Sequence, residues 1–414
     1  MSQICQHRDT CRLCKSRNLT LVFELEPTPP ANAFVKKDQL DKPQVTFPLS
    51  VYFCKNCFHV QLLDVIDPRE LFENYVYVSG TSPLFVNHFQ EYSKFIIESY
   101  LHQQSSFVID IGSNDGTLLK FFKASGCRVL GIDPAREIAN TATKKGIETL
   151  PEFFNNEIAK MIRTKYGSAD VVTANNVFAH IDDLIGFIVS IRDLLTNDGI
   201  FVFEVSYLAD VIEKTLFDMT YHEHLAYHSV IPLVSFFREN GMELVEVVRV
   251  NTHGGSLRGI VQLKGGPHKI SQSVENAIRI EKEMGLDNAI TFQRFATKID
   301  ELKEKFQTLV NNLKSEGKTI AAYGAPAKAT TLMYHFGIGQ EIIDFIVDDS
   351  PLKQGLYSPG KHIPVLAPEA IYQKKPNYLI ILAWNFADAI MKKHAKYGSE
   401  VGHFIIPLPN LMVV

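Results

Sequence analysis

The chain has 414 residues, which is enough for two to four domains of ordinary size. Hydrophobic residues make up 46% of the chain and charged residues 21%, as expected of a folded protein that buries several cores. With 42 basic and 46 acidic residues the net charge is −4, so no general attraction to nucleic acid or to an anionic membrane is expected. No apolar run approaches the roughly 18 residues that span a bilayer, and the polar N-terminus does not resemble a signal peptide. We therefore expect a cytoplasmic, multidomain protein that binds neither nucleic acid nor membrane.

Four of the six cysteines form two C-x-x-C pairs, Cys11 with Cys14 and Cys54 with Cys57. Each pair places two thiolates on one side of a tight turn, and two pairs supply the four sulfur ligands of a tetrahedral Zn²⁺ site. Such a site has no open position for substrate, so one structural zinc ion is expected. Reduced, unligated cysteines and a redox C-x-x-C are the alternatives. A redox motif needs only one pair and would open a βαβ unit, which favours zinc.

The residues 106–112 (SFVIDIG) have the pattern of a buried strand, and residues 118–124 have the pattern of a helix. Gly112 and Gly116 in the turn between them permit a sharp bend and the close approach of a ligand. The turn matches neither G-x-G-x-x-G nor a phosphate-binding P-loop. The next strand ends at Asp133, about 20 residues further on, where a carboxylate can accept hydrogen bonds from ribose hydroxyls.

The side chains around this turn favour S-adenosylmethionine over a dinucleotide. Asp110 and Asp115 place carboxylates where a dinucleotide fold leaves backbone N–H groups free for phosphate. S-adenosylmethionine carries a sulfonium and an ammonium group and no phosphate, so carboxylates beside it are tolerated. Structural roles stay open for both residues, as a helix N-cap for Asp115 and a hydrogen-bonding strand end for Asp110. The expected cofactor-binding residues are Asp110, Gly112, Asn114, Asp115, Gly116, Asp133, Asn175 and Asn176.

Alternating strands and helices continue along the central region. Residues 170–173 and 199–205 have the pattern of strands, with a helix between them. This order predicts a mostly parallel sheet that binds ligands at the carboxyl ends of its strands. Asn175, Asn176 and His180 follow one of those ends.

A dense polar cluster comes next. Residues 221–228 (YHEHLAYH) hold three histidines, two tyrosines and a glutamate. The spacing is not that of an H-E-x-x-H zinc helix, although His224 and His228 are four residues apart and a second metal site stays open as an alternative. A single histidine here could be structural. The cluster as a whole, following a Rossmann-like strand, favours general acid–base catalysis.

The C-terminal third predicts a second α/β unit. Residues 273–318 have apolar positions at alternating spacings of three and four, which indicates a connecting helical region. A strand follows at 319–323, and its turn has one glycine, Gly324, so an independent dinucleotide site is not expected. Lys328, at the start of the next helix, could bind a diphosphate group. A solvated surface lysine is the alternative.

The segment 252–258 (THGGSLR) is a further candidate for ligand contact. Backbone N–H groups around Gly254 and Gly255 and the charge of Arg258 suit phosphate or sugar. The alternative is a β-bulge with a solvated arginine.

Six motifs in this order resemble the zinc-containing sugar C-methyltransferases of deoxysugar pathways: the paired C-x-x-C, DIGSNDGTLL, ANNVFAH, YHEHLAYHS, THGGSLR and YGAPAKAT. That family methylates nucleotide-linked 4-keto-6-deoxysugars, and the resemblance covers nearly the whole chain. It implies an α/β fold with a zinc-binding domain at 1–75, a central Rossmann-like S-adenosylmethionine domain at 76–265, and a C-terminal Rossmann-like domain at 266–414 that includes the connecting helix 273–318.

The resemblance also implies roles for individual residues. His224 is the base that removes a proton beside the ketone, Glu223 orients it, and Tyr221 and His180 contact the sugar or its developing oxyanion. A tyrosine of the zinc domain reaches the active site, and both Tyr75 and Tyr77 match its place. The expected substrate-binding residues are Tyr221, Gly254, Gly255, Arg258, Gly324, Ala325 and Lys328.

The expected function is therefore transfer of a methyl group from S-adenosylmethionine to carbon 3 of a nucleotide-diphosphate 4-ketosugar, through an enolate. The alternatives are an O- or N-methyltransferase acting on a nucleotide-sugar, and a zinc-ribbon binding module on an inactive methyltransferase scaffold. The negative net charge and the lack of aromatic–basic stripes disfavour a nucleic-acid partner for such a module. The sequence predicts neither the nucleotide nor the oligomeric state.

Overall fold

The N-terminal region is built on antiparallel strands. The computed structural model describes residues 4–73, 80, 83–101, 105–252 and 254–414. Strand β1 (Cys5–His7) pairs with β5 (Asp64–Ile66), while β2 (Leu19–Thr28), β3 (Phe47–Cys54), β4 (Val60–Leu62) and β11 (Ala226–Tyr227) form a four-stranded sheet. The short helices η1 (Lys37–Gln39) and α1 (Pro68–Phe72) complete this region. Because β11 lies inside the polar cluster at 221–228 and pairs with β4, that cluster is joined to the N-terminal sheet.

The central region is a seven-stranded sheet in the order β12-β13-β10-β9-β6-β7-β8. Its strands are β6 (Phe107–Ile111), β7 (Arg128–Ile132), β8 (Thr149–Leu150), β9 (Ala169–Asn175), β10 (Leu195–Ser206), β12 (Met242–Val250) and β13 (Ser256–Leu263). All pairs are parallel except those of β13, which runs antiparallel to both β10 and β12. The strand order reverses at β6, which has β7 on one side and β9 on the other, and ligands of open α/β sheets bind at such a switch point.

Helices cover this sheet, as expected for a buried parallel sheet. They are α2 (Pro83–Tyr100), α3 (Thr117–Ala124), α4 (Arg136–Lys144), α5 (Asn156–Tyr166), α6 (Leu184–Leu194), α7 (Leu208–Glu213) and α8 (Val230–Glu239), with the 3-10 turns η3 (Phe178–His180) and η4 (Phe217–Met219). All five residues of β6 are buried, which explains the continuous apolar pattern of its sequence. The predicted strand–turn–helix units are confirmed here.

The C-terminal region is a six-stranded sheet in the order β16-β15-β14-β17-β18-β19. The strands are β14 (Ile320–Tyr323), β15 (Ile346–Val347), β16 (Val365–Leu366), β17 (Tyr378–Ile381), β18 (His403–Ile406) and β19 (Met412–Val413), and only the β18–β19 pair is antiparallel. The helices are α11 (Ala327–His335), α12 (Ala370–Lys374), η5 (Trp384–Phe386), α13 (Ala387–Lys393) and α14 (Ala395–Glu400). The prediction of a second α/β unit is confirmed.

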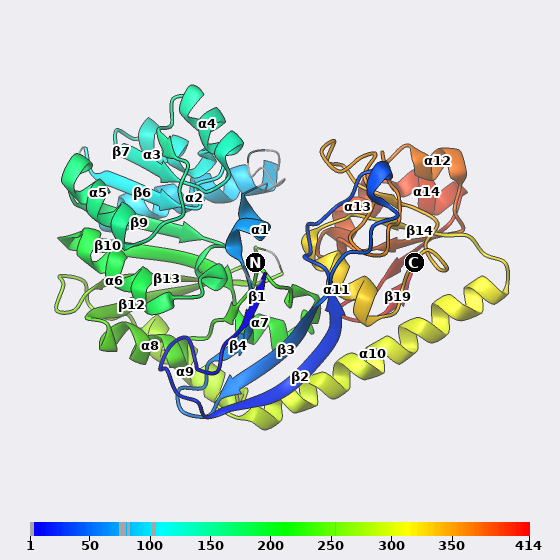
Figure 1. The fold of residues 1–414 in the computed structure, drawn as a ribbon, viewed down its shortest axis with the longest axis horizontal. Helices are drawn as coiled ribbons and strands as arrows, with labels where there is room; N and C mark the ends of the chain where they lie inside the picture. Colours follow the sequence, from blue (N-terminus) through cyan, green and yellow to red (C-terminus); the bar gives the residue numbers. More distant parts are fainter. Residues whose placement is uncertain (1–3, 74–79, 81–82, 102–104, 253) are drawn as a thin grey trace.

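Two helices occupy the connecting region. Helix α9 (Gln272–Glu283) packs on β12 and α8 and so lies against the central sheet, although the sequence places it in the C-terminal domain. Helix α10 (Ala289–Ser315) packs on β2 and runs along the lower edge of Figure 1, from the central region to the C-terminal region. Its 27 residues correspond to a length of about 40 Å. The residues that it buries repeat at spacings of three and four: Phe292, Phe295, Ile299, Leu302, Phe306, Val310 and Leu313.

No helix within the described ranges is both long enough and apolar enough to cross a membrane.

Candidate active site

The four paired cysteines come together in the N-terminal region. Their sulfur atoms all lie within 4.8 Å of one another, with Sγ–Sγ distances of 3.5 Å between Cys11 and Cys57 and 3.6 Å between Cys14 and Cys54. A tetrahedral site with Zn–S bonds of about 2.3 Å has edges of about 3.8 Å, so this arrangement fits one zinc ion held by four thiolates. With no fifth ligand position, the ion would be structural.

The second metal site considered for His224 and His228 is not formed. The Nδ1 atom of His224 lies 2.8 Å from the Met219 carbonyl oxygen, and Nε2 of His228 lies 3.3 Å from the Phe178 carbonyl oxygen. Within the described residues, the four cysteines are the one group of potential ligands close enough to hold a metal ion.

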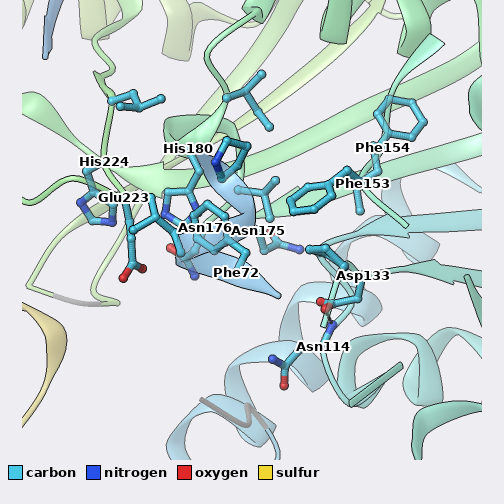
Figure 2. A pocket seen from close by; sticks show the side chains of 18 of the residues that line it. Phe72, Asn114, Asp133, Phe153, Phe154, Asn175, Asn176, His180, Glu223 and His224 are labelled. Carbon is cyan, nitrogen blue, oxygen red and sulfur yellow. Dashed lines mark hydrogen bonds between the residues drawn. The ribbon is translucent and has the colours of Figure 1, made fainter. Parts of the chain in front are cut away.

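A cavity of about 880 Å³ lies at the carboxyl edge of the central sheet. All three regions of the chain contribute to its walls, with Asn32 and Phe72 from the N-terminal region and Lys328 from the C-terminal region. Figure 2 shows His224 and Glu223 at one end of this cavity, Asp133 and Asn114 at the other, and His180 between them. Ligands bound at the two ends would therefore face each other.

Asp133 is fixed at the end of β7 by two backbone donors. Its Oδ2 accepts a hydrogen bond from the Asn114 N–H and its Oδ1 accepts one from the Ala135 N–H, both 2.9 Å long. Each carboxylate oxygen has a further lone pair, so this side chain can still accept hydrogen bonds from ribose hydroxyls. Burial raises the pKa of Asp133 above its ordinary value.

Asp110, at the end of β6, accepts a 2.6 Å hydrogen bond from the Thr173 hydroxyl. Burial, with the Thr173 hydrogen bond opposing it and the charge of Asp133 adding to it, raises the pKa of Asp110 to about 7. A cation bound beside the two carboxylates would favour their ionised forms, and a phosphate would not. This edge of the cavity therefore suits a positively charged ligand.

Asn175 supplies an independent sign of a ligand. Both polar atoms of its side-chain amide are buried at the cavity and make no hydrogen bond of good geometry with the described residues, although the buried Tyr92 hydroxyl lies close enough to interact with the amide. Buried amides are normally hydrogen-bonded, so a ligand group is expected there. Asn176 follows with a φ of +56°, and its N–H donates to the Glu204 carbonyl oxygen at 2.7 Å. The acidic and amide groups together fit S-adenosylmethionine, which presents two positively charged groups and ribose hydroxyls.

The aromatic side of this wall was missed in the sequence. Phe153 and Phe154 line the cavity near Asp133 and offer apolar faces for a flat ring (Figure 2). In the sequence these residues belong to a Pro-Glu-Phe-Phe run directly after the short strand β8. A run of four residues is too short to indicate a binding site.

Two expected cofactor residues lie behind the cavity wall. Asp115 accepts hydrogen bonds from the N–H and the hydroxyl of Thr117, at 3.2 Å and 2.6 Å, and so begins helix α3. Gly116 has a φ of +75°, and a Cβ atom there would lie 2.9 Å from Ile147. Gly112 does line the cavity, and its φ of +70° together with the nearby Val177 side chain excludes a larger residue. Asp115 and Gly116 thus have structural roles.

His224 is held at both ring nitrogens. Because Nδ1 faces the Met219 carbonyl oxygen, it carries the ring proton, and Nε2 then accepts a 2.9 Å hydrogen bond from the Tyr221 hydroxyl. Burial, followed by the charge of Glu223, raises the pKa of Tyr221 well above its ordinary value, so this hydroxyl stays protonated. His224 therefore lines the cavity with Nε2 hydrogen-bonded to the Tyr221 hydroxyl.

Stacked rings fix the orientation of this histidine. His180 stacks on His224 with ring centres 5.2 Å apart, and Phe72 from α1 stacks on His180 at 5.3 Å. Burial and the neighbouring His224 hold the pKa of His180 well below its ordinary value, so His180 is neutral near pH 7. Its Nε2 is buried with no hydrogen-bond partner among the described residues, and the side chain lines the cavity. Phe72 was not predicted, because it enters from the N-terminal region.

Glu223 accepts a hydrogen bond from the N-terminal region. The nitrogens of the His224 ring bond to Met219 and Tyr221, whereas Glu223 accepts a 2.8 Å hydrogen bond from the Asn32 side chain. Glu223 is 2% exposed and lines the cavity. Met219 and Tyr221 therefore hold the His224 ring, and an orienting role for Glu223 stays a prediction.

Two lysines of the C-terminal region also line the cavity. Lys328 donates a 2.8 Å hydrogen bond to Asn385, and burial lowers the pKa of Lys328 to about 8, opposed by the charge of Asp218. Lys353 donates to the Ala325 carbonyl oxygen at 2.8 Å, and burial lowers its pKa as well. Because Lys328 is 7% exposed, the alternative of a solvated surface lysine is wrong. Two buried cations at one cavity suit an anionic ligand.

Gly254, Gly255 and Arg258 are not among the described residues that line this cavity. Arg258 is 7% exposed and donates through Nε and Nη2 to one Glu204 oxygen, at 3.1 Å and 3.0 Å. It therefore serves neither as a ligand contact nor as a solvated arginine. The Gly254 carbonyl oxygen accepts a hydrogen bond from Lys214, and Gly255 packs so closely on Asp210 that a Cβ atom would lie 2.1 Å from it.

Gly324 and Ala325 also lie behind the wall that Lys328 lines. Gly324 has a φ of +89° and packs on Ala383, while the Ala325 N–H donates to Asp348 at 2.6 Å. Tyr75 and Tyr77 lie outside the described residues, so the choice between them stays a prediction.

Comparison with known proteins assigns the chain to a family. Three family models match successive segments of it: "Putative zinc binding domain" over residues 11–72, "Methyltransferase domain" over 87–247, and "C-methyltransferase C-terminal domain" over 251–409. C-methyltransferase NovU of Streptomyces niveus is 32% identical over 414 residues, which cover 100% of this chain and 99% of that protein. The chain belongs to the zinc-containing, S-adenosylmethionine-dependent C-methyltransferases. The resemblance noted in the sequence is confirmed.

Two solved methyltransferase structures each match less than half of this chain. An S-adenosylmethionine-dependent methyltransferase from Clostridium acetobutylicum is 14% identical with a TM-score of 0.35, over 43% of this chain and 92% of that one. Magnesium protoporphyrin IX methyltransferase of Synechocystis PCC 6803, with bound S-adenosylhomocysteine, is 14% identical with a TM-score of 0.34, over 44% and 83% of the two chains.

Proposed function

We propose that this C-methyltransferase acts on carbon 3 of a nucleotide-linked 4-keto-6-deoxysugar, through an enolate, with His224 as the general base. One observation carries the proposal. A single cavity combines a carboxylate edge for a cationic cofactor, a histidine whose ring nitrogens bond to the Met219 carbonyl and the Tyr221 hydroxyl, and two buried lysines for an anionic substrate. The proposal places the reaction in the cytoplasm and assigns a single structural zinc ion to the N-terminal region.

The cofactor end is the better defined of the two. S-adenosylmethionine, when bound, supplies a methyl group on a positively charged sulfur that a carbon nucleophile can attack. Asp133 and the Asn114 turn would hold its ribose, Asn175 would satisfy its polar groups, and Asp110 would face its positive charges.

The chemistry at the other end follows from the His224 hydrogen bonds. A hydrogen beside a ketone is acidic because its removal leaves an enolate, and a base near neutrality can take it. Nε2 of His224 receives this proton once the Tyr221 hydroxyl rotates away from it. The Met219 carbonyl then stabilises the imidazolium that forms, since its bond to Nδ1–H strengthens as the ring gains charge.

The same rotation gives Tyr221 a second role. Its hydroxyl can donate to the enolate oxygen as negative charge develops there, and its raised pKa keeps the proton on the phenol. Neutral His180, between Phe72 and His224, is available as a second polar contact for the sugar. Proton removal and oxyanion stabilisation are thereby assigned to neighbouring side chains.

The remaining groups suit the rest of the substrate. Lys328 and Lys353 would bind the diphosphate, and Glu223, held by Asn32, would accept hydrogen bonds from a hydroxyl or amino group of the sugar. The name of the Streptomyces niveus relative, a C-methyltransferase, favours carbon over oxygen or nitrogen as the acceptor.

The proposal is tested by mass spectrometry on the purified protein. The protein and S-adenosylmethionine are incubated in deuterated buffer with a panel of nucleotide-4-keto-6-deoxysugars. A product that gains one methyl group and loses the hydrogen of carbon 3 is expected for one nucleotide series. A methylated product that keeps this hydrogen would mean methylation at oxygen or nitrogen and would overturn the proposal. Metal analysis of the same sample should give one zinc per chain, and less for Cys54→Ser.

A further inference from the structure

The anchor of His224 lies on a short segment that the C-terminal region holds. The Met219 carbonyl, which accepts from Nδ1 of His224, belongs to the 3-10 turn η4. The turn and its flanks are buried, and Phe217 packs on His335 and Phe336. The position of this carbonyl therefore depends on contacts outside the central sheet.

Two hydrogen bonds from the C-terminal region fix the segment on either side of Met219. Nε1 of Trp384 donates to Oδ2 of Asp218 at 2.5 Å, and the Thr331 hydroxyl donates to the Thr220 carbonyl oxygen at 2.7 Å. Asp218 is fully buried, and its Oδ1 has no hydrogen-bond partner among the described residues. A buried carboxylate with so few donors depends on the indole and on the charge of the nearby Lys328.

Trp384 also contacts the lysine of the substrate cavity. Nζ of Lys328 lies 3.6 Å from the centre of the indole ring, in cation–π contact. Lys328 lines the cavity, whereas Trp384 and Asp218 lie behind it. A continuous set of contacts therefore runs from Lys328 through Trp384, Asp218 and Met219 to His224.

We propose that Asp218 is a positioning residue for His224, and that Trp384 links it to the anionic group of the substrate bound at Lys328. This inference rests on the proposed function, since it assumes that His224 is the base. An anion at Lys328 shifts the ammonium on the indole face and so acts on the Trp384–Asp218 hydrogen bond. The nucleotide end of the substrate then helps to set the geometry of the base.

The positioning role predicts a change in the basicity of His224. A firm acceptor for Nδ1–H raises the basicity of Nε2, so a displaced Met219 carbonyl lowers it. In Trp384→Phe, the aromatic ring beneath Lys328 remains and the donor to Asp218 is lost. We expect about a tenfold slower exchange of the substrate carbon-bound hydrogen with deuterated buffer, with the midpoint of its pH profile at lower pH. Binding of S-adenosylmethionine should be unchanged.

Two neighbouring threonines of α11 supply a matched pair of variants. Thr331→Val removes the bond to Thr220, and Thr330→Val removes a 3.0 Å bond to the Ala31 carbonyl oxygen of the N-terminal region. We expect Thr331→Val to shift the pH midpoint in the same direction as Trp384→Phe, and Thr330→Val to leave it in place. Equal midpoints in all three variants and the wild type, with only thermal stability reduced, would overturn the positioning role. Absence of exchange in the wild type would instead count against the proposed function.

The link to the anion can be read directly, because Trp384 is the single tryptophan of the chain. Addition of inorganic pyrophosphate should change the tryptophan emission of the wild type and leave that of Lys328→Met unchanged. A wild-type emission that pyrophosphate does not alter, or an equal change in Lys328→Met, would overturn the link between Lys328 and Trp384.

Discussion

The central and C-terminal α/β units share one local structure and use it differently. In both, a strand runs into a turn and a helix, and the next strand ends in an aspartate that accepts backbone hydrogen bonds. Asp133 accepts from Asn114 and Ala135, and Asp348 accepts from Ala325 and Ser350, through Oδ2 and Oδ1 respectively. The central unit, which faces the cofactor end of the cavity, and the C-terminal unit, which does not, thus share the same hydrogen bonds at this turn.

The difference lies in what each unit presents to the cavity. The central unit presents the turn itself, with Asp110, Asn114 and Asp133. In the C-terminal unit Gly324, Ala325 and Asp348 do not line the cavity, and its charged contributions are Lys328, from the helix that follows, and Lys353. The central and C-terminal units therefore supply opposite charges to one cavity. Charge, more than backbone geometry, decides which ligand each unit binds.

The largest expected effect on methyl transfer comes from loss of the proposed base, His224. His224→Asn removes the proton acceptor, and we expect single-turnover methyl transfer to fall by about a thousandfold, within the range usual for loss of a general base. Binding of S-adenosylmethionine, measured by calorimetry, should be retained. The control is His228→Asn in the same cluster, since His228 stacks on Phe178 with ring centres 4.5 Å apart and does not line the cavity. Turnover in His224→Asn equal to that of the control would contradict the assignment.

Removal of one charge from the central unit and one from the C-terminal unit should have reciprocal effects on the affinities for the two ligands. Asp110→Asn is expected to weaken S-adenosylmethionine about 10- to 100-fold and leave nucleotide-sugar affinity unchanged, because it removes a charge only at the cofactor end. Lys328→Met should do the opposite. Calorimetric titration of each variant with each ligand gives the four affinities. If both variants weakened both ligands equally, the two ends would not be separate sites.

The affinity of the acidic end of the cavity for S-adenosylmethionine should also depend on pH. Because the pKa of Asp110 is about 7, its carboxylate is lost as the pH falls below 7, and S-adenosylmethionine affinity should drop by up to tenfold per pH unit. Asp110→Asn should flatten this dependence between pH 5 and 7.

The stability of the unliganded protein should change in the opposite sense. The native state holds the Asp110 proton more tightly than the unfolded chain, so the contribution of Asp110 to stability is full at low pH and is lost as the pH rises towards 7. Asp110→Asn should therefore melt at a higher temperature than the wild type at pH 8, with a smaller difference at pH 5. A difference that grows as the pH falls would mean that Asp110 is not held with a raised pKa.

The smallest effect is expected where the N-terminal region touches the cavity. Asn32→Ala removes the hydrogen bond to Glu223, and we expect the KM for the nucleotide-sugar to rise a few-fold with little change in kcat, because an ordinary hydrogen bond is worth about 1 kcal/mol. Steady-state kinetics measure both constants. A fall in kcat without a change in KM would mean that Asn32 acts on the chemical step.

The sequence predicted those features of the site that are local. Asp110, Asn114 and Asp133 follow strands whose apolar patterns are clear, and their positions at strand ends follow from the topology. The spacing within each C-x-x-C turn likewise fixes the relative position of its two sulfur atoms. The residues at these strand ends could therefore be placed without the rest of the fold, whereas Asp115 and Gly116 of the same turn were also expected at the ligand and lie behind the cavity wall.

Residues whose partners lie far along the chain could not be placed in this way. Arg258 pairs with Glu204 because β13 lies antiparallel beside β10, and the sequence gives no sign of that register. The burial of Lys328 depends on Trp384 and Asp218, which come from two different regions of the chain. Asn32 enters the cavity from the N-terminal region, which only the assembled fold brings there.

The central claim is that the enzyme first forms a carbon nucleophile beside the ketone. The most direct measurement is proton NMR of the wild-type protein in deuterated buffer, with the nucleotide-4-ketosugar that it methylates and S-adenosylhomocysteine in place of the methyl donor. We predict that the signal of the hydrogen on carbon 3 disappears over time, without formation of product. A signal that persists while the same sample methylates the sugar after addition of S-adenosylmethionine, with the hydrogen retained in the product, would contradict the account.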